Sequence, residues 1–186
     1  EVEYEMPEVA GKWETNYRVL ASGEIQVENR FTTSNADELP YLPRFGMRMR
    51  LPKEMDQMQW FGRGPFENYW DRKTAANVGL YSSTVAEQYF SYVSPQENGN
   101  KCDVRWATFT DEEGQGLLIA GAPLLSVSAL PFSMEDLNRS SRAEGHVNEL
   151  KPRNFISLNV DLKQTGMGGD NSWGATAYEP YMLFPK

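Results

Sequence analysis

Cysteine and histidine are almost missing from the sequence, which has one of each among its 186 residues. A single cysteine excludes an internal disulfide, and Cys102 lies in the alternating stretch KCDVRWATF, where a small buried side chain is expected rather than a nucleophile. The single histidine, His146, is predicted to lie in a polar loop. It lacks partners for a zinc site, and no CxxC pair, GxSxG turn, phosphate-binding loop or calcium-binding loop is present. The residues alone therefore offer neither a catalytic set nor a metal-ligand set.

Runs of basic residues and long apolar runs are also missing. Asp and Glu number 26 against 18 Lys and Arg, which gives a net charge of −8, and the basic residues are scattered. Nucleic acids and anionic membranes bind basic patches, so neither is an expected partner. No apolar stretch approaches the roughly 20 residues that span a bilayer. The sequence starts without methionine, so the missing signal peptide leaves the cytoplasm and the periplasm both open.

Alternation of apolar and polar residues, typical of β-strands, runs through most of the chain. It predicts hairpins over residues 11–31 and 103–122, and further strands over residues 44–52 and 155–166. Such strands are expected to bury one face in antiparallel sheets and to solvate the other. The side chains expected on buried faces include Ile25, Val27, Phe45, Met47, Met49, Leu51, Ile156, Leu158, Val160 and Leu162. Those expected on the solvated face of residues 155–166 are Ser157, Asn159, Asp161 and Lys163.

Helical signals are short. Ser133 is predicted to cap a turn over residues 134–137, and residues 84–89 are predicted to add another turn. Neither can supply the crossover helices that a parallel sheet needs, so the fold class is predicted to be an all-β antiparallel sandwich with only short helical turns. We expect residues 1–186 to form a single domain. Because YEPYMLFPK stops as an apolar stretch begins, this domain is expected to be a fragment of a larger multidomain protein.

Two segments combine aromatic rings with polar side chains. WFGRGPFENYWDRKTAANVGLY covers residues 60–81, and SYVSPQENGNKCDVRW covers residues 91–106. Aromatic faces beside Asp, Asn, Glu and Arg are one way in which proteins bind sugars. The alternative, which we favour, is a pair of structured loops whose polar groups satisfy one another and the buried backbone.

A third segment, TGMGGDNSWG at residues 165–174, surrounds a tryptophan with glycines. Gly168 and Gly169 can adopt positive φ, and Asp170 and Asn171 favour turns. The loop is therefore expected to hold Trp173 in a fixed direction. The residues leave two interpretations open, because the ring could either fill a core or present its face to a ligand.

In this order, the motifs WFGRGPFENYWDRK, YVSPQENGN with DVRW, and TGMGGDNSW closely resemble the C-terminal domain (domain 5, or small chain) of β-galactosidases of glycoside hydrolase family 2. The similarity runs from about Gly11 to the end of the chain. It implies a large antiparallel β-sandwich of the supersandwich, galactose-mutarotase-like type. The family's domain begins upstream of Glu1 and continues past Phe184, so this chain is expected to lack strands that its sheets need.

The resemblance also implies a division of labour between domains. The parent enzyme is expected to hydrolyse terminal β-D-galactosides such as lactose with retention of configuration, using two glutamates on a (β/α)8 barrel of the same polypeptide. No catalytic residue is therefore expected in this chain, which should be inactive alone. The family's magnesium and sodium ions are bound mainly by other domains, so no metal or other cofactor is expected here. A homo-oligomeric parent is left open.

The site residue that the resemblance transfers to this chain is Trp173. In the family, the tryptophan of the GGDxSW motif lies at the rim of the active site and forms a platform for the sugar, chiefly on the aglycone side. Gly168, Gly169, Asp170 and Asn171 are expected to support it, although Asn171 stands where Asp is common.

Two other functions are alternatives to this one. An autonomous carbohydrate-binding module would bind sugar through exposed aromatics such as Trp60, Trp106 or Trp173. An aldose mutarotase is suggested by fold analogy alone. It needs an acid/base pair that usually includes histidine, and His146 has no suitable context, so the binding module is the stronger alternative.

Overall fold

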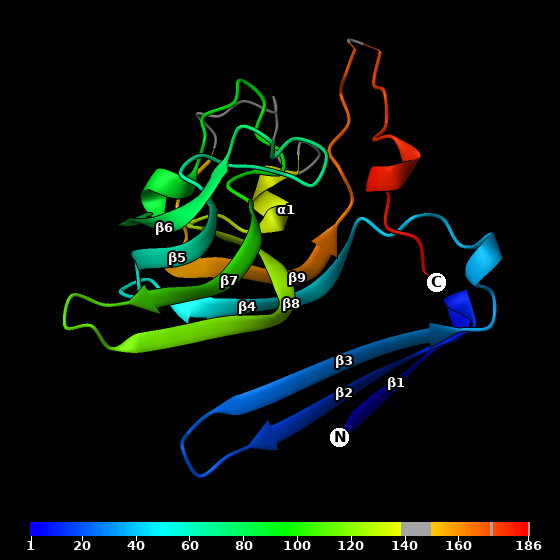
Figure 1. Cartoon of the computed structure of the whole chain (residues 1–186), viewed down its shortest axis with the longest axis horizontal. Coiled ribbons are helices and arrows are strands. Elements are labelled where there is room, and N and C mark those ends of the chain that lie inside the picture. The colour runs from blue at the N-terminus through cyan, green and yellow to red at the C-terminus, as the bar shows by residue number, and fades with distance from the viewer. Residues whose placement is uncertain (139–149, 172, 186) are drawn as a thin grey trace.

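Two antiparallel sheets are the main elements of the computed structural model, which describes residues 1–138, 150–171 and 173–185 (Figure 1). One sheet has three strands in the order β1–β2–β3, and the other has six in the order β4–β9–β8–β7–β5–β6. The strands are β1 (Val2–Met6), β2 (Gly11–Val19), β3 (Ile25–Thr33), β4 (Arg44–Pro52), β5 (Gln57–Gly64), β6 (Asn77–Thr84), β7 (Lys101–Thr110), β8 (Gly116–Leu130) and β9 (Phe155–Gln164). The predicted all-β antiparallel class is confirmed. A single domain over residues 1–186 stays a prediction, and His146 lies outside the described residues.

Helical structure is confined to single turns, as predicted. The helix α1 (Met134–Leu137) begins at Ser133, whose hydroxyl accepts the backbone N–H of Asp136 while Asp136 caps the N–H of Ser133 in return. The 3-10 turns are η1 (Pro7–Val9), η2 (Ala36–Glu38), η3 (Ala86–Gln88) and η6 (Glu179–Tyr181). Within the described ranges, no helix is long and apolar enough to cross a membrane.

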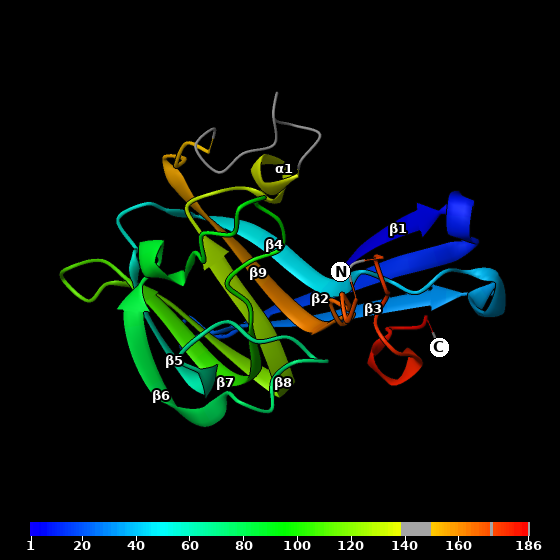
Figure 2. The same cartoon turned by 90° about the horizontal axis from the view of Figure 1, so that it is seen from above.

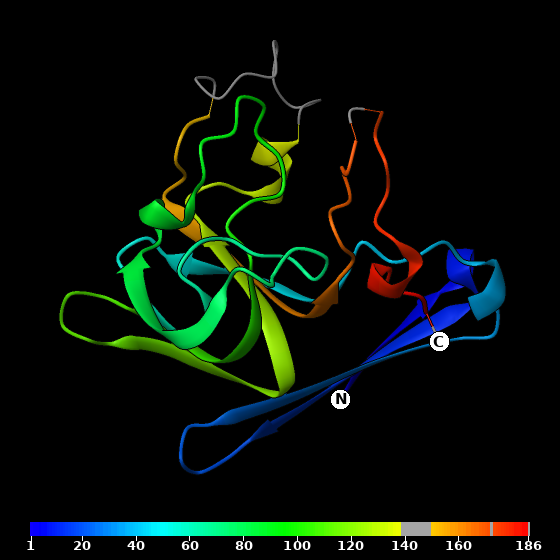
Figure 3. The ribbon, with the colours of Figure 1, turned by 45° about the horizontal axis from the view of Figure 1, so that its top comes forward.

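The six-stranded sheet curls around the main core (Figure 3). Its inward side chains include Trp60 of β5 and Phe109 of β7, which are 1% and 0% exposed. The other buried members of this core are Leu51, Met58, Val85, Val104, Ala107, Val127, Ala129, Ile156 and Leu158. The pairing of β7 with β8 shifts register between Lys101 and Trp106, and such irregularities bend a sheet. Cys102 is buried at this bend, as expected, and burial raises the pKa of its thiol to about 11, which disfavours the reactive thiolate.

The second face of β9 differs from the prediction. Ser157, Asn159 and Asp161 were expected to be solvated, but all three are buried. The reason is that β9 lies between β4 and β8, and α1 covers this side of the sheet (Figure 2). An ion pair of 2.6 Å joins Arg48 of β4 to Glu135 of α1. The expected burial of Leu162 is also wrong, since its side chain is exposed.

In the three-stranded sheet, side chains that were expected to be buried are exposed. Its hairpin β2–β3 forms as predicted, but Ile25 and Val27 are 59% and 40% exposed instead of buried. Only one end of its apolar face is packed, where the ring centroids of Trp13 and Phe45 lie 5.0 Å apart. The remainder extends away from the six-stranded sheet (Figures 1 and 3).

Candidate functional site

Trp173 lies on a loop that projects from the six-stranded sheet after β9, drawn in orange to red in Figure 1. We call residues 165–178 the Trp173 arm, of which residue 172 lies outside the described ranges. The indole is 93% exposed, so it does not fill a core formed by the described residues of this chain. An exposed indole offers an apolar face on which a sugar ring can stack, but it has no acid or base to cleave a glycosidic bond, which most glycosidases do with two carboxyl groups.

The turns of the arm follow from its residue types. Gly168 and Gly169 have φ of +64° and +79°, a region that side chains with a Cβ seldom adopt. The N–H of Gly169 donates to the carbonyl of Ala175 over 2.7 Å and joins the two limbs. The amide oxygen of Asn171 accepts the N–H of Trp173 at 2.8 Å. These hydrogen bonds join described residues of the arm on either side of its tip, while the role of Trp173 in binding stays a prediction.

The base of the arm is held by residues distant in sequence. The hydroxyl of Thr165 donates to the carbonyl of Leu42 over 2.7 Å and accepts the N–H of Leu183 at 2.9 Å. The carboxylate of Asp71 accepts the N–H groups of Met167 and Gly168 at 3.0 and 2.8 Å. The sequence places Asp71 among the polar side chains of residues 60–81, but nothing in the spacing links that segment to the arm.

Residues 60–81 and 91–106 interlock with each other. The amide oxygen of Asn68 accepts the N–H of Cys102 at 2.8 Å, and the amide nitrogen of Asn100 donates to the carbonyl of Asn68 over 2.9 Å. The carboxylate of Glu67 accepts the N–H of Gly99 at 2.8 Å and the hydroxyl of Tyr92. These contacts support the interpretation as structured loops whose polar groups satisfy one another, but only for the parts of the two segments that lie between strands. The ends of the segments belong to β5, β6 and β7.

The three tryptophans considered for sugar binding have different surroundings. Trp60 is buried in the main core and donates its indole N–H to the carbonyl of Arg63 over 3.0 Å, so it cannot serve as a platform. Trp106 is half-buried on the opposite face of the sheet, directly across from Phe61. Trp173 alone among these three presents nearly its whole side chain.

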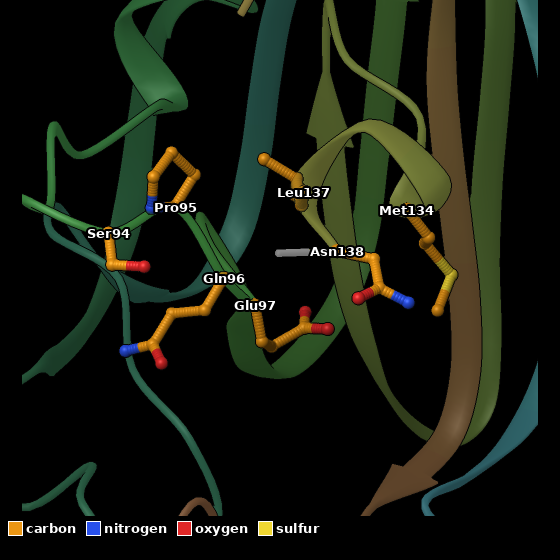
Figure 4. Close-up of a pocket in the computed structure, with 7 residues that line it drawn as sticks. All are labelled: Ser94, Pro95, Gln96, Glu97, Met134, Leu137 and Asn138. Carbon is orange, nitrogen blue, oxygen red and sulfur yellow. The ribbon is translucent and has the colours of Figure 1, made fainter. Parts of the chain in front are cut away.

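A pocket of about 450 Å³ lies between residues 94–97 and α1 (Figure 4). Glu97 and Asn138 face each other across it in this view. Beneath it, Arg44 contacts Glu97 and Asp161, each at 3.3 Å. Burial raises the pKa of Asp161 to about 7, although Arg44 acts against this rise. Since Arg44 pairs with both carboxylates, this arrangement is a partly buried ion-pair network that joins β4, β9 and the loop.

One group of acidic residues has the spacing of metal ligands. Among the described residues, Glu1, Glu3 and Glu14 bring carboxylate oxygens within 4.8 Å of one another. Lys12 lies among them and forms ion pairs with Glu3 at 2.9 Å and with Glu14 at 3.4 Å. The lysine supplies the positive charge that these carboxylates attract, so ion pairing accounts for the cluster.

The chain thus has an all-β fold and exposes the aromatic side chain of Trp173 on the arm. The chain belongs to the β-galactosidase small chain family, whose model matches residues 1–186. This confirms the resemblance seen in the three motifs.

Similar proteins include several bacterial β-galactosidases. Identity is 40% over 168 residues with the β-galactosidase of Priestia megaterium, 34% over 169 residues with that of Halalkalibacterium halodurans, and 36% over 171 residues with β-galactosidase BgaC of Bifidobacterium adolescentis. Each match covers 90% of this chain but 16% of the relative. The chain therefore corresponds to a small part of each relative's length.

Proposed function

We propose that this chain acts as the C-terminal domain of a retaining β-galactosidase and supplies Trp173 as a platform for the sugar, chiefly on the aglycone side. The observation that carries the proposal is the 93% exposure of Trp173 on an arm whose base and turns are fixed. A large aromatic side chain is normally buried, and its display on a loop that is hydrogen-bonded at its base favours a binding role. Hydrolysis itself is assigned to a barrel elsewhere in the same polypeptide, together with the magnesium and sodium sites.

A second observation supports a partner domain. Cross-strand pairing puts Tyr4, Tyr17, Val19 and Ile25 on one face of the three-stranded sheet, and all four are exposed. The opposite face is polar and carries Glu3, Glu5, Lys12, Glu14, Arg18, Glu28 and Arg30. A large exposed apolar face beside a charged one marks an interaction surface. We assign it to the remainder of the polypeptide, since the relatives are much longer than this chain.

Replacing Trp173 by alanine in the full-length enzyme tests the platform. We expect KM for lactose to rise roughly two- to tenfold, because an aromatic contact contributes about 0.5–1.5 kcal/mol. The inhibition constant of free galactose should change little, since the platform lies on the aglycone side. The matched control is Tyr178→Ala, which removes another exposed aromatic from the same arm and should leave KM unchanged. Unchanged lactose kinetics in Trp173→Ala would count against the proposal.

The alternative of an autonomous carbohydrate-binding module makes a different prediction. Such a module would bind galactose or lactose as an isolated chain, and calorimetric titration would detect this. A platform that completes a pocket in another domain should give no measurable heat of binding.

A further inference from the structure

We infer that Asp71 is a positioning residue for Trp173, holding the limb of the arm from which the tryptophan is presented. The inference rests on the proposed function, because it concerns sugar binding through Trp173. It goes beyond the proposed function because Asp71 belongs to residues 60–81 and not to the arm that carries Trp173. No substrate contact is assigned to Asp71.

The first observation is the way in which the carboxylate contacts the arm. Each oxygen of Asp71 accepts one backbone N–H, Oδ1 from Met167 at 3.0 Å and Oδ2 from Gly168 at 2.8 Å. At these positions the chain has already left β9, so no neighbouring strand supplies these acceptors. Hydrogen bonds to an ionised acceptor are stronger than those between neutral groups. The carboxylate thus takes over the role of a strand partner at the base of the arm.

The second observation is that Gly166 leaves room for this contact. A Cβ added to Gly166 would lie 2.6 Å from Cγ and 2.7 Å from Oδ2 of Asp71, too close for either atom to stay in place. The N–H of Gly166 donates to the carbonyl of Tyr181 over 2.8 Å, which limits how far this backbone could move away. The position of the Asp71 carboxylate therefore requires glycine at position 166.

The third observation connects the contact between Asp71 and Gly166 to the tryptophan. Gly168, which is held by Asp71, starts the turn of positive φ that continues through Gly169. A Cβ on Gly168 would lie 2.5 Å from the carbonyl oxygen of Ala175, so the two limbs are in close contact directly after the clamp. A shift of the Met167–Gly168 backbone is consequently transmitted to both limbs. The residue next to Asp71 adds a second link, since the ring of Trp70 lies 6.1 Å from that of Tyr181.

The test uses the full-length enzyme and compares three single variants. Asp71→Asn keeps the shape of the side chain but places an amide NH₂ against a backbone N–H. We expect KM for lactose to rise roughly two- to tenfold with kcat nearly unchanged, as for Trp173→Ala. Gly166→Ala should do the same by displacing the carboxylate with its charge intact. The matched control is Asp111→Asn, because Asp111 also accepts two backbone N–H groups, from Glu113 and Gln115, but at the distant β7–β8 turn.

The double variant Asp71→Asn/Trp173→Ala distinguishes positioning from general damage. If Asp71 acts through Trp173, the double variant should have the KM of Trp173→Ala alone. Wild-type KM in both Asp71→Asn and Gly166→Ala would overturn the inference, and so would a further rise of KM in the double variant. A wild-type KM in Trp173→Ala would contradict the proposed function. That result is obtained from the Trp173 variant alone and does not depend on any variant of Asp71.

Discussion

Replacing Asn68 by alanine is expected to lower the free energy of unfolding by about 2–5 kcal/mol. The side chain has no exposed surface, and its amide oxygen accepts the N–H of Cys102 at 2.8 Å. Its amide nitrogen donates to the carbonyl of Phe66 over 3.0 Å. Alanine leaves both backbone groups unsatisfied in the interior, at about 1–3 kcal/mol each, and creates a cavity. The loss should loosen the junction between residues 60–81 and 91–106.

Urea denaturation followed by tryptophan fluorescence measures this change. The matched control is Asn77→Ala, since Asn77 is exposed on β6 and its substitution should change stability by no more than about 0.5 kcal/mol. Asn68→Asp is a second variant, because it keeps the acceptor for Cys102 but sets an oxygen against the carbonyl of Phe66. A loss below about 1 kcal/mol in Asn68→Ala would show that water replaces both contacts.

The importance of Asn68 could not be predicted from the sequence. Its partners Asn100 and Cys102 lie 32 and 34 positions away, and no periodicity joins such residues. Local patterns were more informative. Alternation predicted β2, β3, β4, β7, β8 and β9, although not β1, β5 and β6. The Ser133 cap follows from hydrogen bonds within four residues.

Burial was predicted less well than the strands themselves. Alternation shows which side chains share a face, but it does not show what covers that face. Asp161 is buried where Arg44 contacts it, and Arg44 in turn contacts Glu97 and Met134 of α1. Ile25 is exposed because no described segment covers that part of its sheet. In the candidate site, too, local features could be predicted from the sequence and contacts between distant segments could not. The turn around Trp173 could be predicted from adjacent residues, whereas its support by Asp71 depends on a contact across 96 positions.

Replacing Lys101 by methionine is expected to raise the free energy of unfolding at pH 7 by about 1–3 kcal/mol. The lysine is 1% exposed, and its ammonium group donates to the carbonyl of Gly99 over 3.1 Å and lies 5.3 Å from the ring centroid of Trp60. Burial lowers the pKa of Lys101 to about 8, although the charge of Glu67 acts against this. Methionine fills a similar volume without a charge to desolvate, and the lost hydrogen bond offsets part of the gain.

The pH dependence of this effect identifies its cause. In the unfolded chain the lysine keeps its proton up to a pKa of about 10.4, whereas in the folded chain it releases the proton above about pH 8. Between these values the unfolded state binds more protons, so the stability of the wild type should rise with pH by up to about 1.4 kcal/mol per unit. Lys101→Met lacks this rise, so its advantage is complete below pH 8 and shrinks toward pH 10. Denaturation curves between pH 7 and 9.5 measure it, with the exposed Lys53→Met as the control that should follow the wild type. Parallel stability curves for the wild type and Lys101→Met would show that the buried ammonium group is not destabilising.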